Sequence, residues 1–347
     1  MNWTLSPPRN ALLPKPPRLQ LALLIDEFVE RAGQPYLEFW IALGQNSCRL
    51  RRMLTHVIVA WDLLQIDAAL VDEDLMTTCQ HLRIKDEVLE NPLTTWVYTK
   101  KLWMIEKVVL LGFEQDIYLP DEYAAMYYFL HTIASTRKAL LEQCIEHLGD
   151  RSKQLLLANR FGDAQETDDM GPYIDSELQQ AKGISALAKA LYGFYTILLY
   201  LHLLPCPNRP FSTEELRYEL RMKPFIALQP VEVPTFADFK KALQPYGAYG
   251  SPTPSLYTSL RKQDSTLWTD IETPLKSAKE AFTRVKKYGA EKGRASGVEL
   301  AWGKEVNGLL ASCVALGVAV AGVKTAVTDV GDRQKVCLLY TSDAADE

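Results

Sequence analysis

The sequence predicts an all-α fold in which long antiparallel helices are joined by extended, proline-rich wrapping segments. Apolar residues recur every three or four positions along most of the chain, which is the period of an amphipathic helix. No convincing stretch alternates apolar and polar residues as a half-buried strand would, and no repeat of roughly 20 to 50 residues stands out. Prolines and glycines separate the helical stretches.

The N-terminal part divides into a linker and a helical region. Residues 1–17 contain five prolines and are predicted to be an extended linker. Residues 18–149 form the first helical region. Within it, helices are expected from Leu50 through Ala68, from Pro92 to Gly112, and from Pro120 to Gly149. The short connections between them favour antiparallel packing.

The C-terminal part begins with an acidic segment, residues 150–177, that is predicted to be a flexible loop. Residues 178–336 form the second helical region, and six prolines between Pro224 and Pro254 predict extended chain there. A long apolar helix is expected over 176–204, before these prolines. Two short helices are expected next: one is capped by Ser212 with Glu215 and ends before Pro224, and the other is capped by Thr235 with Asp238. Two further helices are expected over 255–288, with a break at Pro274, and over 298–328. Residues 337–347 resemble a translated sequencing adaptor and are expected to be an artefact.

The composition excludes several classes of protein. The chain has 347 residues and a net charge of -5, with 48% hydrophobic and 23% charged residues. These values exclude wholesale disorder, a polytopic membrane protein and a generally cationic nucleic-acid-binding surface. Six scattered cysteines without a C-x-x-C pair indicate a reduced cytosolic or nuclear compartment. The apolar runs Ile184–Leu204 and Val306–Gly322 are interpreted as buried helices, so no membrane partner is expected.

No catalytic, cofactor-binding or metal-binding motif emerges. The close pairs Cys144 with His147 and Cys79 with His81 lack the second pair that a zinc site needs. The segment Gln244–Tyr249 departs from an acetyl-CoA pyrophosphate loop because Tyr249 replaces a small residue, and it is interpreted as a surface turn. A dispersed active site of Asp116, Glu122 and His131 is a rival hypothesis, but these residues match no known acid–base set.

Two clusters of positive charge are candidates for contact with a polyanion. Arg49, Arg51 and Arg52 begin the first long helix, where a solvated face is the simpler interpretation. Residues 276–294 carry seven basic and two acidic residues, opposite an apolar stripe of Leu275, Ala278, Phe282 and Val285. On this helix Lys279, Lys286 and Lys287 are predicted to contact the ribosome or RNA, with a solvated face as the alternative.

Two segments resemble the large auxiliary subunit of the NatC N-terminal acetyltransferase complex. They are Leu110–Tyr118, which contains GFEQDIY and is followed by Glu122-Tyr123, and Glu215–Phe225, which reads ELRYELRMKPF. A weaker match covers Gly44–Arg52, and the similarity extends over residues 45–260. The family's N-terminal half has no counterpart, so we expect the chain to represent its C-terminal portion. The candidate partner-binding residues are Gly112, Phe113, Glu114, Asp116, Tyr118, Glu122, Tyr123, Glu215, Arg217, Tyr218, Glu219, Arg221, Pro224 and Phe225.

The resemblance implies a non-catalytic scaffold in the cytoplasm. In that family a separate catalytic subunit of the GNAT fold binds acetyl-CoA and acetylates nascent chains that begin Met-hydrophobic. A small Sm-like subunit completes the complex, and the large subunit holds both and contacts the ribosome. The alternative is a free-standing α-helical adaptor protein unrelated to acetylation. Each motif also has a purely structural interpretation. In the first, Phe113, Ile117 and Tyr118 only form a packed turn between helices; in the second, Arg217, Glu219 and Arg221 only pair with Glu215 and with one another.

Overall fold

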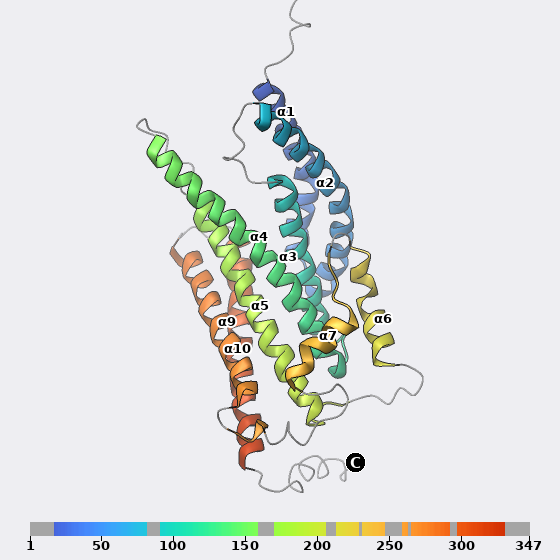
Figure 1. The fold of residues 1–347 in the computed structure, drawn as a ribbon. Helices are drawn as coiled ribbons and strands as arrows, with labels where there is room; N and C mark the ends of the chain where they lie inside the picture. The colour runs from blue at the N-terminus through green and yellow to red at the C-terminus, as the bar shows by residue number, and fades with distance from the viewer. Residues whose placement is uncertain are drawn as a thin grey trace, which may run out of the picture. The chain divides into compact units, whose positions relative to one another are not determined.

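The computed structural model describes residues 17–81, 91–158, 170–205, 213–228, 231–246, 259–262, 265–291 and 297–329. All regular structure within these ranges is helical, which confirms the all-α fold (Figure 1). In chain order the elements are α1 (Pro17–Leu43), α2 (Ser47–His81), α3 (Pro92–Glu114), the 3₁₀ turn η3 (Pro120–Glu122), α4 (Tyr123–Ala158), α5 (Met170–Tyr200), α6 (Glu214–Ile226), α7 (Phe236–Leu243), the 3₁₀ turn η4 (Gln244–Tyr246), α9 (Thr266–Glu291) and α10 (Gly297–Asp329). The chain forms two compact units, residues 1–101 and 102–347, and the boundary lies within α3.

The first unit contains an antiparallel hairpin of α1 and α2. The Trp61 indole N–H donates to the Pro35 carbonyl at 3.4 Å, and Arg31 pairs with Asp67 at 3.5 Å. Residue numbers therefore rise along α2 as they fall along α1. The apolar stripe predicted from Leu50 to Ala68 is largely buried, and α2 confirms the helix expected there.

The start of α3 is fixed by a carboxylate from α2. Asp72 is fully buried, and its two oxygens accept hydrogen bonds from the backbone N–H groups of Leu93 (3.1 Å) and Thr94 (2.7 Å). These donors would otherwise lack partners in the first turn, and the negative charge suits the helix N-terminus. Pro92 begins the helix as predicted, because its missing N–H costs nothing there.

The second unit is built around the long helices α4, α5, α9 and α10, which run side by side (Figure 1). The Ser135 and Ser185 hydroxyls are hydrogen-bonded at 2.9 Å, and Glu142 pairs with Lys182 at 3.1 Å. This order makes α4 and α5 antiparallel. In the same way, Phe282 and Ile271 of α9 lie against Gly183 and Gly193 of α5, respectively. Leu275 and Glu272 of α9 lie against Gly317 and Lys324 of α10, respectively, so both pairs are also antiparallel. The prediction of long antiparallel helices is therefore confirmed.

A buried ion pair joins α3 to α4 inside this unit. The Arg137 guanidinium donates to a Glu106 carboxylate oxygen at 2.9 Å, and both side chains are almost completely inaccessible to solvent. Burial raises the pKa of Glu106, and the charge of Arg137 opposes that shift. Because removing either partner would leave an unpaired buried charge, this pair fixes which faces of α3 and α4 meet.

Several helices extend beyond their predicted bounds. α3 continues past Gly112 to Glu114, and α4 continues past Gly149 to Ala158. α5 begins at Met170, before its predicted start, but ends at Tyr200, short of its predicted end. The predicted loop 150–177 is therefore helical at both of its ends, and residues 159–169 lie outside the described residues. The two helices that flank this segment, α4 and α5, both belong to the second unit. At the α5 end, Ser176 and Glu177 are buried, so packing prevailed over the polar composition there.

Prolines do not end helices where the sequence suggested. Pro224 lies inside α6, and Pro274 lies inside α9, which is continuous where a break was expected. Around Pro274 the helix buries Ile271, Ala278 and Phe282, and this burial outweighs the ~3 kcal/mol that an interior proline costs. The extended chain expected after Pro224 begins only after α6. Residues 1–16, 206–212 and 247–258, which include most of the other proline-rich positions, lie outside the described residues.

Among the described residues, three helices are long and apolar enough to cross a membrane, by length and composition alone: α2, residues 173–200 of α5 and residues 303–327 of α10. Most of the α5 window is buried, at 61%, which agrees with the predicted buried helix. Only 22% of the α10 window is buried, so the prediction for Val306–Gly322 was wrong. α10 buries Val306, Cys313, Leu316 and Val320 on one side, whereas Val314 and Val318 on the other side are 55% and 70% exposed.

Candidate functional site: the junction of the two sequence motifs

The first motif forms the turn between α3 and α4. Asp116 adopts a positive φ of 49°, and the backbone N–H of Ile117 donates to the Gly112 carbonyl at 3.0 Å. This turn folds the Tyr118 ring back against Gly112, where any Cβ atom would overlap the ring. Gly112 is therefore needed for the close approach of an aromatic ring, and Asp116 occupies the left-handed position that reverses the chain.

An aromatic cluster supports this turn. The Phe113 ring stacks on Tyr127 with centroids 4.1 Å apart and planes 9° apart, and it meets Tyr118 and Tyr123 edge-on. Tyr195 of α5 stacks on the other side, 5.5 Å from Tyr127. Burial raises the pKa of the Tyr127 and Tyr195 hydroxyls. The cluster is a neutral packing device that holds the turn against α5.

The second motif, on α6, is tied to the first by two ion pairs. Arg217 donates to Asp121 at 3.1 Å, and Arg221 donates to Glu122 at 2.7 Å. The same Glu122 oxygen accepts the backbone N–H of Leu119 at 2.9 Å, and the Arg221 guanidinium lies 5.4 Å from the Tyr118 ring. Among the described residues, the ion pairs of these two arginines are with Asp121 and Glu122, so the interpretation that Arg217, Glu219 and Arg221 only pair with Glu215 and with one another was wrong. Residues almost one hundred positions apart form one junction.

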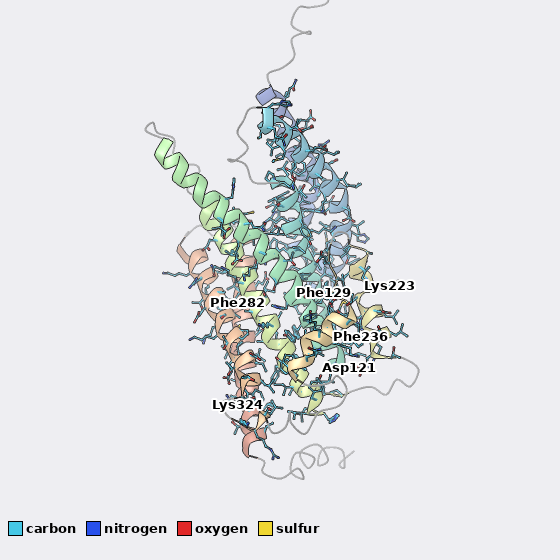
Figure 2. The ribbon with its side chains drawn as sticks, viewed as in Figure 1. Asp121, Phe129, Lys223, Phe236, Phe282 and Lys324 are labelled. Atoms are coloured by element: carbon cyan, nitrogen blue, oxygen red, sulfur yellow. The ribbon has the colours of Figure 1, made fainter. Side chains whose placement is uncertain are left out.

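The inner face of α6 completes the junction. Thr213 caps the helix by accepting the Leu216 N–H at 3.2 Å, so the cap is Thr213 and not the predicted Ser212. Tyr218 stacks on Phe239 of α7, and its hydroxyl donates to the Pro234 carbonyl at 2.8 Å. Phe225 packs on Phe129 of α4 with centroids 4.8 Å apart. Thr235 caps α7 with Asp238 as predicted. In Figure 2, Asp121, Phe129 and Phe236 gather where α6 and α7 meet the long helices.

The structure separates the candidate partner-binding residues into two groups. Those with buried or half-buried side chains, or no side chain, build the junction itself: Gly112, Phe113, Tyr118, Glu122, Tyr123, Arg217, Tyr218, Arg221 and Phe225. Those that are exposed are Glu114, Asp116, Glu215, Glu219 and Pro224. Sequence reasoning missed Asp121, which pairs with Arg217. It lies between the two parts of the first motif, Leu110–Tyr118 and Glu122-Tyr123. Sequence reasoning also missed the exposed apolar residues of α6, namely Leu216, Leu220 and Ile226.

The cavity that the described residues form at the junction is too small for a substrate. The cavity among Asp121, Glu214, Arg217 and Arg221 measures about 30 Å³, which suits a water molecule. A second cavity of about 350 Å³ lies between α5 and α10, and its lining holds apolar side chains, Ser312, Tyr127 and Tyr195 but no charged group. Within the described ranges, no group of three or more His, Cys, Asp or Glu residues could hold a metal ion.

The residues of the rival active site belong to different networks. Glu122 is held by Arg221, as above, whereas His131 Nδ1 lies 2.9 Å from the Ser185 carbonyl and 3.0 Å from its hydroxyl. Burial lowers the pKa of His131. The segment predicted to be a surface turn also differs, because Tyr246 is buried and its hydroxyl lies against Gly193. Residues 247–249 lie outside the described residues.

The basic helix adopts the predicted orientation. On α9 the side chains of Ala278, Phe282 and Val285 are buried, Leu275 is half-buried, and Lys279, Lys286 and Lys287 are exposed. The Phe282 ring occupies the space that a Cβ atom at Gly183 would need. In Figure 2, Phe282 and Lys324 lie on α9 and α10, away from the α6 junction. Arg49 and Arg52 are exposed at the start of α2, and Arg51 is half-buried.

Antiparallel helices that pack against one another within each unit, and a junction that fixes α6 to the turn before α4, are typical of helical-repeat proteins. A family model described as "NAA35-like, TPR repeats" matches residues 5–335, and the chain belongs to this family. No repeat stands out in the sequence itself, because a helical hairpin can recur as a structure while its residues differ from one repeat to the next.

Known relatives agree with this assignment. The auxiliary subunit of NatC from Saccharomyces cerevisiae, N-alpha-acetyltransferase 35, is 22% identical over 64% of this chain and 31% of its own length. The Homo sapiens protein of the same name is 31% identical over 30% of this chain and 14% of its own length. The fold matches a chain in the crystal structure of the apo NatC complex with a TM-score of 0.69 at 17% identity, covering 88% of this chain and 44% of that one. The chain therefore spans less than half the length of these relatives.

Proposed function

We propose that this chain is part of a non-catalytic auxiliary subunit of a NatC N-terminal acetyltransferase complex. Family membership and a fold shared with a chain of solved NatC complexes support the proposal. The observation that carries it is the junction of the two motifs. These motifs are the two segments that resemble the NatC auxiliary subunit, and their side chains hold α6 in place rather than form an active site. A scaffold needs such rigid placement of its partner-binding helices.

The outward face of α6 is the candidate contact for a catalytic subunit of the GNAT fold. Leu216, Leu220 and Ile226 are 43%, 59% and 52% exposed, next to the exposed charges Glu219 and Lys223. A helix that is apolar on both faces is expected to bury both. The catalytic subunit would bring acetyl-CoA, so this chain would hold no cofactor. A small Sm-like subunit would complete the complex.

The finer parts of the proposal concern the ribosome and the substrate. Lys279, Lys286 and Lys287 would face ribosomal RNA in the cytoplasm, because their helix is anchored by its buried apolar stripe. The assembled complex would then acetylate nascent chains that begin Met-hydrophobic. No membrane contact is part of this proposal.

Co-purification with a GNAT-fold catalytic subunit tests the central claim. The wild-type chain should retain that subunit, and L216E/L220E should release it, because two charges would be buried without partners. The matched control is V314E/V318E on α10, where the apolar side chains are similarly exposed, and it should retain the subunit. Failure of the wild-type chain to bind any GNAT-fold subunit would favour the free-standing adaptor instead.

A further inference from the structure

α2 carries a second apolar stripe on the side away from its buried face. Val59, Leu63, Ile66 and Leu70 are 56%, 72%, 61% and 58% exposed. Their spacing of four, three and four residues is that of the a and d positions of a coiled coil. The stripe lies opposite the buried residues that pack within the first unit, such as Trp61. A continuous exposed stripe of large apolar residues indicates a protein–protein contact.

The two ends of this stripe carry opposite charge. Continued with the same spacing, the stripe reaches Arg52 and His56 at its N-terminal end and Glu73 at its C-terminal end, and all three are exposed. Asp74 is also exposed and adds to the acidic end. We call the seven residues Arg52, His56, Val59, Leu63, Ile66, Leu70 and Glu73 the α2 seam.

The seam is complementary to itself when it is reversed. If two α2 helices cross antiparallel about a point between Leu64 and Gln65, Leu63 of one copy lies level with Ile66 of the other. In the same register Val59 lies level with Leu70 and His56 lies level with Glu73. Arg52 lies one helical turn from Glu73 of the other copy, so the basic end lies near the acidic end at both extremities. A parallel pair would place Arg52 against Arg52 and Glu73 against Glu73, which is unfavourable. The order of charges along the α2 seam therefore favours the antiparallel orientation over the parallel one.

We propose that the α2 seam is an interface between two copies of this chain, paired antiparallel about a two-fold axis. Such an isologous contact needs only one self-complementary patch. The exposed small residues Ala60 and Ala69 flank the apolar centre and let the two helices approach closely. Charge complementarity argues for a second copy, because an unrelated helix would need the same order of basic, apolar and acidic residues.

Sedimentation velocity of the full chain over a concentration series tests the association. The wild type should change from monomer to dimer as concentration rises. L63E/I66E should weaken dimerisation at least ~100-fold, because each dimer loses four buried apolar side chains. V314E/V318E on α10 is the matched control and should dimerise like the wild type. Circular dichroism should show equal helicity in all three proteins.

Charge reversal tests the orientation. Arg52→Glu alone and Glu73→Arg alone should each weaken the dimer several-fold, since each places like charges about one helical turn apart across the antiparallel interface. A mixture of these two variants should form heterodimers, because each then supplies the charge that the other lacks.

Three results would overturn the proposal. One is a chain that stays monomeric at every concentration. Another is a mixture of the reversed variants that associates no better than either variant alone. The third is a catalytic subunit that binds the wild type but not L63E/I66E while no dimer forms, which would assign the seam to that subunit.

Discussion

Gly112 illustrates how one residue can suit two structural roles. Its position after an apolar helix predicts a helix end, yet α3 continues through it to Glu114, and the chain reverses at Asp116. The requirement for glycine comes instead from the Tyr118 ring, which lies against the α3 backbone at that point. Only the contact between residues six positions apart reveals this role.

Substituting Gly112 therefore has a defined cost. Gly112→Ala should destabilise the chain by about 2 kcal/mol, because the new methyl group displaces the Tyr118 ring and the aromatic cluster behind it. The control is Gly308→Ala in α10, where nothing lies within 4 Å of the new methyl group. That variant should be more stable by up to ~1 kcal/mol, since alanine favours a helix. Urea unfolding measures both, and equal effects at the two sites would contradict the packing role.

Arg221 provides the second test at this scale. Arg221→Ala removes an ion pair with Glu122 at 2.7 Å whose side chains are 27% and 11% exposed. The expected loss is about 1 to 2 kcal/mol after allowance for partial solvent screening. Lys138→Ala breaks an exposed pair at 3.9 Å and should change stability by less than ~0.5 kcal/mol. Hydrogen exchange should then accelerate in α6 of the Arg221 variant only, and unchanged exchange would refute the junction's role in holding that helix.

At the scale of elements, α6 and α9 show what holds a helix that contains proline. In α6 the last turn continues past Pro224 because Phe225 packs on Phe129. In α9 the buried stripe on both sides of Pro274 maintains one helix. α9 therefore presents its basic residues along one continuous outer face, as an RNA-facing surface would require.

Charge reversal on α9 tests its contact with the ribosome. K279E/K286E/K287E should abolish co-sedimentation of the assembled complex with ribosomes. K189E/K240E/K241E, which reverses three exposed lysines on α5 and α7, should retain it. For the unaltered complex, each neutralised phosphate should add roughly 0.7 to 0.9 to the log–log slope of binding against salt. Normal co-sedimentation of the α9 variant would leave this helix as a solvated face.

At the scale of the whole molecule, neither of the two cavities described above, both lined by described residues, combines the size of a substrate with charged side chains. The larger cavity, about 350 Å³, has no charged side chain to bind phosphates. The acetyl-CoA-like segment places Tyr246 in the core and not beside a cofactor. Both observations fit a subunit whose chemistry is supplied by another chain.

Calorimetry with acetyl-CoA tests this separation of roles. The purified chain should give no saturable heat and no acetyl transfer, because phosphate recognition needs backbone donors or basic side chains around one site. The complex with a GNAT-fold subunit should bind acetyl-CoA with one site per complex. One-site binding to this chain alone would refute a purely auxiliary role.

The sequence by itself determined the helical class, the start of α3, the cap of α7 and the buried stripe of α9, because each depends on residues within a few turns of one another. It also contained the two motifs, but not their relation. Tertiary structure alone decided that Arg217 and Arg221 meet Asp121 and Glu122, and that helices run through Pro224 and Pro274. These outcomes depend on contacts between residues that are distant in sequence. The free energy of such packing exceeds the local conformational preference of the residues, and such contacts produce no periodic pattern in the sequence.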